Sequence, residues 1–199
     1  MSFTYSHIGA STAAVANRIV TTANMKVGTY TIANGGVPVW DGAARITVTH
    51  SQVGGVTDTL GTITVVGKSL AGQTITEVIT PLDGTVATGA KFFRSVTSVT
   101  GAGWIIDTGN DTIVVGVAAD AYVIGSGGVL YALVINTAAA AAITLSDGRG
   151  TIATIPSNQA AGTYYLYDVI CSGYLKVATT STNDITVIHG DTVPQFATS

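Results

Sequence analysis

The sequence predicts an all-β protein: two tandem antiparallel β-sandwich domains, Ig-like or jelly-roll-like, with an extended N-terminal arm. Thr, Val, Ile, Ala and Gly recur in short alternating runs, and β-branched residues favour a pleated, half-buried surface. The runs follow one another at roughly 8–12-residue spacing with Gly, Asn and Asp between them, which is typical of sandwiches and barrels. Glu77 is the only Glu, and charged residues make up only 10% of the chain, so the polar faces of surface helices could hardly be built.

The first 26 residues are polar and small, with Phe3 and Tyr5 near the tip. We expect residues 1–26 to form an arm that becomes ordered on a neighbouring molecule. A helix is plausible only near residues 10–20, where the alanines tolerate it, and it would be short.

Residues 27–118 are predicted to form the first sandwich domain. Residues 45–50 alternate perfectly, with Ile46 and Val48 on one face. Two further runs flank a turn segment with Gly at both ends, which indicates a β-hairpin with a long loop. The remaining expected strands of this domain are 62–66, 74–79, 92–99, 104–106 and 112–117.

Residues 119–128 are predicted to be a Gly-rich linker, because Gly125-Ser126-Gly127-Gly128 is the most flexible stretch of the sequence. The β pattern then restarts and supplies six strands, enough for a second small sandwich over residues 129–199. The alternative is one large jelly roll in which the Gly-rich stretch is an internal corner. The expected strands are 129–136, 141–145, 151–155, 163–170, 173–178 and 184–189.

Composition and charge exclude several classes of protein. A charged fraction of 10% compares with roughly 25% in a typical soluble domain, and the mean hydropathy of +0.48 argues against disorder. The net charge is −3 and the eight Lys and Arg are dispersed, so we expect no nucleic-acid partner. No run of about 18 apolar residues is present, so we expect no membrane partner. The N-terminus does not resemble a secretory signal, and we expect the chain to be made and assembled in the cytoplasm.

Residues that could carry chemistry are scattered, and we predict no enzyme activity, no cofactor and no metal. The three histidines are far apart in sequence, and no zinc-protease or phosphate-loop motif occurs. Cys171 lacks a basic neighbour that would activate it, so we expect a small buried apolar residue. Glu77 is expected on the solvent face or paired with Lys68 or Lys91. Asp107, Asn110 and Asp111 could offer oxygens to calcium, but the twelve-residue loop pattern is missing, and an Asx-type turn fits better.

Aromatic side chains are the candidates for recognition. Phe3 and Tyr5 could contribute to an interface, and Trp40 and Trp104 could each anchor either a core or an interface.

A second aromatic group follows later in the chain. Tyr164, Tyr165 and Tyr167 could form a glycan-binding platform, although alternation places Tyr164 opposite the other two and favours ordinary sandwich packing.

Several segments of the first domain resemble a β module frequent in virion proteins of tailed bacteriophages. These are residues 45–49, 58–67, 72–79, 89–99 and 111–117. Residues 128–130, 143–147, 162–164 and 184–187 are similar to a phage structural module. The resemblance implies a structural role as a capsid decoration or cement protein, a head fibre, or a tail or neck component, and it brings no catalytic residue with it.

A chain so poor in charge risks low solubility unless neighbouring subunits cover much of its surface. We therefore predict a non-enzymatic virion protein, assembled in the host cytoplasm, that decorates the capsid and stabilises the head. Its expected partners are the major capsid protein and further copies of itself, as a homotrimer. The alternatives are a tail or neck component and a carbohydrate-binding host-attachment module.

Overall fold

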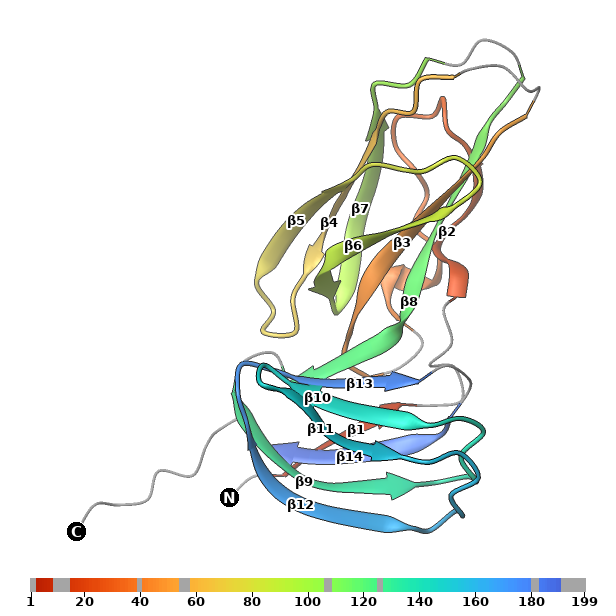
Figure 1. The fold of residues 1–199 in the computed structure, drawn as a ribbon. Helices are drawn as coiled ribbons and strands as arrows, with labels where there is room; N and C mark the ends of the chain where they lie inside the picture. The colour runs from red at the N-terminus through yellow and green to blue at the C-terminus, as the bar shows by residue number, and fades with distance from the viewer. Residues whose placement is uncertain are drawn as a thin grey trace. The chain divides into compact units, whose positions relative to one another are not determined.

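The structure is a computed structural model of the chain, and it describes residues 3–8, 15–38, 41–53, 58–105, 109–124, 127–179 and 183–190. Within these residues the protein consists of fourteen β-strands and one short 3-10 helix (Figure 1). Every pair of neighbouring strands with a described register is antiparallel, which confirms the all-β, antiparallel prediction. No helix of the described chain is long and apolar enough to cross a bilayer.

The chain forms two compact units. Unit 1 contains residues 1–13, 39–42 and 119–199, and unit 2 contains residues 14–38 and 43–118. The boundary falls inside β8 (Thr112–Ile124), whose first part pairs with β2 in unit 2 and whose last part pairs with β13 in unit 1.

Unit 1 is built from two four-stranded layers (Figure 1). One sheet has the order β1-β14-β9-β12, and the other consists of the end of β8 followed by β13, β10 and β11. The strands are β1 (Thr4–Ile8), β9 (Gly128–Ile135), β10 (Ile143–Asp147), β11 (Gly150–Ile155), β12 (Tyr164–Cys171), β13 (Leu175–Thr179) and β14 (Ile185–Gly190).

Unit 2 also has two sheets. In one, β8 lies between β2 and β3, and β6 pairs with the far side of β3; the other has the order β5-β4-β7. The elements are β2 (Val15–Asn24), the 3-10 helix η1 (Asn34–Gly36), β3 (Ala43–Ser51), β4 (Thr62–Lys68), β5 (Thr74–Ile79), β6 (Val86–Phe93) and β7 (Ser95–Ala102).

Period-two alternation places apolar side chains inside each unit. In β3, Ile46 and Val48 are fully buried, as the alternation predicted, and Arg45 and Thr49 are half-buried. Other fully buried side chains in unit 2 include Ile19, Met25, Ile63, Val65, Phe93, Val99, Ile113, Val115 and Val117. Those in unit 1 are Ile8, Leu130, Leu133, Ile135, Ile143, Leu145, Leu175, Ile185 and Val187.

The run 92–99, predicted as one strand, is two. Phe93 pairs with Ala44 of β3, whereas Ser95 pairs with Lys68 of β4, so the chain passes from one sheet to the other at Arg94. Of the expected strand 104–106, Ile105 forms an isolated bridge with Thr59, and residue 106 lies outside the described residues. A single-sequence pattern does not show such a change of sheet, because both halves remain β-like.

The N-terminal segment is extended where it is described, but it pairs within this chain. β1 joins β14, and β2 joins β8. The helix considered for residues 10–20 is wrong for residues 15–20, which belong to β2; residues 9–14 lie outside the described residues.

The two units differ from the predicted domains, because the segment predicted as one N-terminal arm is divided between them. β1 belongs to unit 1 and β2 belongs to unit 2. In the expected linker 119–128, residues 119–124 continue β8 and Gly128 begins β9. Residues 125 and 126 lie outside the described part.

Candidate functional site

The most distinctive surface of unit 1 is the outward side of the sheet β1-β14-β9-β12. Across the strands, Tyr5 lies opposite Ile188, and Ile188 lies opposite Ala132. In the next row, His7 lies opposite Thr186, Thr186 opposite Val134, and Val134 opposite Tyr164. The alternate residues of these strands, such as Ile8, Val187 and Leu133, are buried in the core. We call this side the outer apolar face; the registers place Tyr5, His7, Val129, Ala132, Val134, Tyr164, Ile170, Thr186 and Ile188 on it, of which Val129 and Ala132 are buried, and Phe3 and Tyr131 contact each other at one end.

Large apolar side chains on this face meet solvent. The exposed fractions are 64% for Tyr5, 65% for Tyr164, 49% for Phe3 and 47% for Ile170. An antiparallel sheet with one face on a core normally carries polar residues on the other face. Here both faces are apolar, which marks the outer apolar face as a surface suited to contact with another molecule.

An aromatic pair closes one end of the face. The Phe3 and Tyr131 ring centroids are 4.9 Å apart with the planes at 75°, an edge-to-face contact. Thr4 pairs with His189, which brings Phe3 level with Gly190. Gly190 has no side chain, and Phe3, which directly precedes β1, contacts Tyr131 of β9 across β14 at this position.

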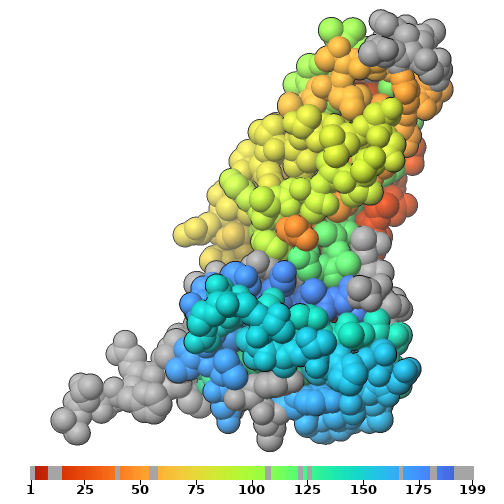
Figure 2. Space-filling view, viewed as in Figure 1, coloured from red at the N-terminus to blue at the C-terminus, as the bar shows by residue number. Residues whose placement is uncertain are grey.

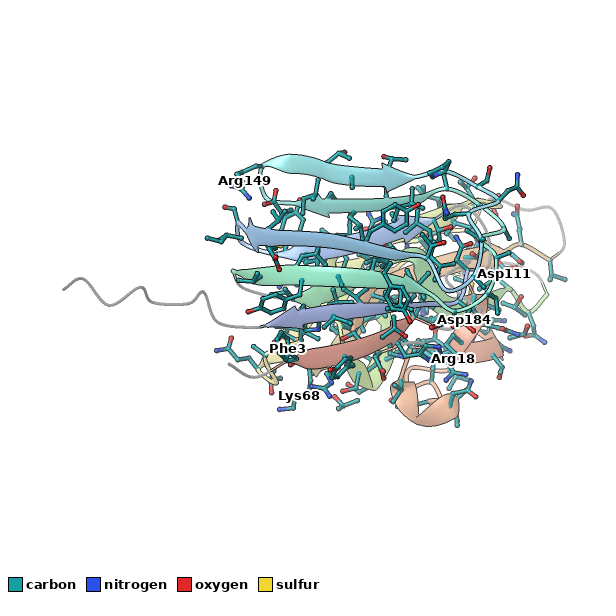
Figure 3. The ribbon with its side chains drawn as sticks, turned by 90° about the horizontal axis from the view of Figure 1, so that it is seen from below. Phe3, Arg18, Lys68, Asp111, Arg149 and Asp184 are labelled. Carbon is teal, nitrogen blue, oxygen red and sulfur yellow. The ribbon has the colours of Figure 1, made fainter. Side chains whose placement is uncertain are left out.

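The opposite end of the face is polar, and Figure 3 shows Phe3 and Asp184 at its two ends. The His7 Nε2 atom lies 2.8 Å from Asp184 Oδ1, and the Asn136 amide donates to the same oxygen at 2.9 Å. Hydrogen bonds from Asn136 and His7 lower the pKa of Asp184. Asp41 protects the edge of β1 here, since its carboxylate accepts from the His7 N–H and its own N–H donates to the His7 carbonyl.

Unit 2 contains a buried charged cluster that the sequence did not reveal. His50 is 1% exposed; its Nδ1 lies 3.0 Å from Asp83 and its Nε2 lies 2.9 Å from Asp111, which is fully buried. The two contacts join opposite nitrogens of one imidazole ring to carboxyl groups that lie far apart in the sequence. Burial raises the pKa of Asp111, but the hydrogen bond from the Val53 N–H and the interactions with the Asp58 and His50 side chains outweigh it and lower the pKa. Asp111 therefore joins segments that are distant in the sequence; Asp107, the first residue of the expected Asx-type turn, lies outside the described residues.

Unit 1 has a second buried carboxylate, Asp147. It accepts hydrogen bonds from the backbone N–H groups of Ser172 and Arg149 and from the Arg149 guanidinium, whose Nη2 lies 2.7 Å away. Burial alone would raise the pKa of Asp147, but these bonds and the Arg149 charge lower it to about 2. The group joins the β10–β11 turn to the end of β12, which is a structural task.

The residues singled out from the sequence are in different surroundings. Phe3 and Tyr5 share the outer apolar face, Trp40 lies outside the described residues, and Trp104 is half-buried in unit 2. Burial raises the pKa of the Tyr30 hydroxyl, and its interaction with Trp104 acts against this rise. Trp104 therefore lies beside Tyr30, and both side chains approach Gly101.

The outcome for the other expected residues is mixed. Tyr164 is exposed and Tyr165 is half-buried, so these two tyrosines do not form one platform. Cys171 is buried, as expected, and burial raises the pKa of its thiol. The sequence analysis did not predict that Tyr131 and Ile188 lie on the outward side of this sheet. In residues 185–188, apolar side chains occur at both odd and even positions, and this pattern could have indicated a strand that is apolar on both sides.

Among the described residues, no group of three or more His, Cys, Asp or Glu could hold a metal ion. Comparison with family models, with curated proteins and with solved structures gives no match. The fold therefore defines a class, an all-β protein with antiparallel β-sandwich units, and the outer apolar face is its best candidate for a site of interaction.

Proposed function

We propose that this protein is a non-enzymatic structural component of a bacteriophage virion, a decoration or cement protein that binds the outer capsid shell and stabilises the head. Its partners in this proposal are the major capsid protein and other copies of itself, as a homotrimer. The observation that carries the proposal is the outer apolar face, in a chain with only 10% charged residues.

A protein that bridges subunits needs more than one surface of contact, and unit 2 offers a second. Val78 of β5, Leu82 and Val86 of β6 follow one another along the chain, and each is at least half exposed, at 60%, 51% and 52%. Permanent interfaces are richer in apolar groups than transient ones, which agrees with exposed apolar side chains in both units. Many copies, each contributing a few kcal/mol, would together resist the internal pressure of a filled head.

Counting copies in purified virions tests the proposal. Quantitative peptide analysis against the major capsid protein should give hundreds of copies per particle, and electron cryomicroscopy should place the chain on the shell. A handful of copies confined to the tail or neck would contradict decoration and favour the alternative structural role. Absence from purified particles would overturn a virion function altogether.

A further inference from the structure

We propose that Asn34 is a site of spontaneous chemical modification, at which the side-chain amide is lost and the chain acquires an aspartyl or isoaspartyl residue. This inference concerns unit 2 alone and does not rest on the virion role. The modification adds a negative charge to a chain whose net charge is −3.

The sequence around Asn34 supplies the reacting groups. Asn34 is the only asparagine of the chain that precedes a glycine. The backbone nitrogen of Gly35 attacks the side-chain carbon Cγ of Asn34, a C–N bond forms, and the amide nitrogen leaves as ammonia with the proton of the Gly35 N–H. Water then opens the cyclic imide at either carbonyl, which gives an aspartate or an isoaspartate. Glycine favours the attack, because it has no side chain beside the nitrogen and allows the widest range of backbone conformations.

The structure presents this dipeptide to solvent. Asn34 and Gly35 are exposed residues of η1, so water and base reach both reacting groups. Their φ angles are +53° and +63°, in the left-handed region that glycine adopts freely and that asparagine tolerates. The hydrogen bonds that close the turn are donated by the N–H groups of Gly36 and Val37, the residues after the attacking nitrogen.

One hydrogen bond slows the reaction in the folded protein. The Asn34 Nδ2 atom donates to the Arg18 carbonyl at 2.9 Å, and the amide has to leave this carbonyl before the ring can close. Because the bond is exposed, water can replace it at a small cost. We therefore expect the folded chain to react more slowly than the unfolded chain, but still to react.

The product cannot reproduce the contact that Asn34 makes. The Asn34 amide and the Arg18 Nε atom, which donates to the Val37 carbonyl at 2.8 Å, together join η1 to β2. An aspartate offers only acceptors to the Arg18 carbonyl, so the first bond is lost. An isoaspartate also lengthens the main chain next to Gly36, where a Cβ atom would lie 2.0 Å from the Val96 carbonyl oxygen. η1 then has to move away from β2 or from β7.

Asn158 is a matched internal control. It is exposed, its φ angle is +66°, and it precedes Gln159 instead of a glycine. The two asparagines therefore share exposure and backbone conformation, and they differ in the residue whose nitrogen has to attack. Trypsin separates them, because Asn34 lies in the peptide 27–45 and Asn158 lies in the peptide 150–176.

Incubation of the full chain at mildly alkaline pH, followed by trypsin digestion and mass spectrometry, is the test. The peptide 27–45 should gain the mass difference between NH2 and OH and separate into an aspartyl and an isoaspartyl form. This change should be at least severalfold faster than any change of the peptide 150–176, and ammonia should be released in proportion to it. Asn34→Gln keeps an amide but requires a larger ring, so it should leave the peptide 27–45 unchanged over the same period.

Asn34→Asp reports the structural consequence directly. The Ala33 N–H donates to the Ile19 carbonyl of β2 at 2.8 Å, and its hydrogen exchange should be faster in this variant than in wild type. Asn158→Asp adds the same charge at the other exposed, left-handed position and should leave the exchange at Ala33 unchanged. Circular dichroism establishes that each variant is folded.

Three results would overturn the inference. The first is an unchanged mass of the peptide 27–45 in the folded chain after the same peptide of the urea-unfolded chain has been converted. The second is an equal rate of change at Asn34 and Asn158. The third is unchanged hydrogen exchange at Ala33 in Asn34→Asp. None of these results bears on the virion role, which the counting of copies in virions tests separately.

Discussion

Glu77 of β5 and Lys91 of β6 each form side-chain hydrogen bonds with the backbone of the other residue's strand. The Glu77 carboxylate accepts hydrogen bonds from the backbone N–H groups of Ala90 and Lys91, while the Lys91 Nζ donates to the Thr76 carbonyl at 2.6 Å. These two strands belong to different sheets of unit 2, and their atoms form a continuous surface (Figure 2). The only Glu of the chain thus connects the edges of two sheets.

Removing this connection should destabilise unit 2 moderately. We expect Glu77→Ala to lower the free energy of unfolding by about 1 kcal/mol or slightly more, because water can partly replace the lost acceptor at these exposed N–H groups. Glu77→Gln should cost less, since it keeps one acceptor oxygen. Urea denaturation measures both. Thr76→Ala is the control, because its carbonyl still accepts from Lys91; an equal loss in that variant would contradict the assignment.

Asp147 and Arg149 should respond unequally to truncation. Asp147 is 2% exposed and satisfies two backbone N–H groups besides the guanidinium, so Asp147→Ala leaves buried donors without an acceptor and should cost about 2–4 kcal/mol. The Arg149 side chain is 63% exposed, and Arg149→Ala should cost clearly less stability than Asp147→Ala. Equal costs in urea denaturation would show that the ion pair, rather than the backbone bonds, holds this turn.

Acid should weaken unit 1 through the same carboxylate. The pKa of Asp147 is about 2 in the folded protein and 3.8 ordinarily, so the unfolded chain binds a proton more readily. The stability that Asp147 contributes is therefore complete well above pH 3.8 and is lost as the pH falls towards 2. A series of urea midpoints from pH 6 to pH 2 should fall in this window, and Asp147→Asn should flatten that part of the curve.

A double-mutant cycle should detect the buried cluster of unit 2. His50→Ala and Asp111→Ala should each cost about 2–4 kcal/mol, because each leaves a buried polar partner. The double variant should cost less than the sum, with a coupling of at least about 1 kcal/mol. Asp83→Ala is the comparison, since the Asp83 side chain is 57% exposed and should couple weakly to His50. Strict additivity for His50 and Asp111 would contradict the contact.

Gly116 should not tolerate a side chain. A Cβ atom there would overlap the backbone carbonyls of Val15 and Ala16 of β2, and backbone atoms cannot move aside cheaply. Gly116→Ala should therefore lower the thermal midpoint by several degrees, corresponding to about 1–3 kcal/mol. Gly28→Ala is the matched control, because its nearest neighbour would lie 4.0 Å away. A midpoint equal to the control would show that β2 can shift away from β8.

The sequence by itself determined the secondary structure class and most strands. Period-two alternation in residues 45–50, 74–79 and 184–189 identifies strands without knowledge of their partners, because it reflects only which side chains avoid water. Composition likewise indicated that the surface is poor in charge.

Tertiary structure alone decided which strands meet. The change of sheet at Arg94, the pairing of β1 with β14, and the approach of His50 to Asp111 all join residues whose spacing along the chain carries no signal. The outer apolar face arises in the same way: Tyr5, Ile188 and Tyr164 share one side of a sheet only through the registers of three strand pairs. Alternation predicts on which face of its own strand a side chain lies, whereas the register between strands decides which other side chains share that face.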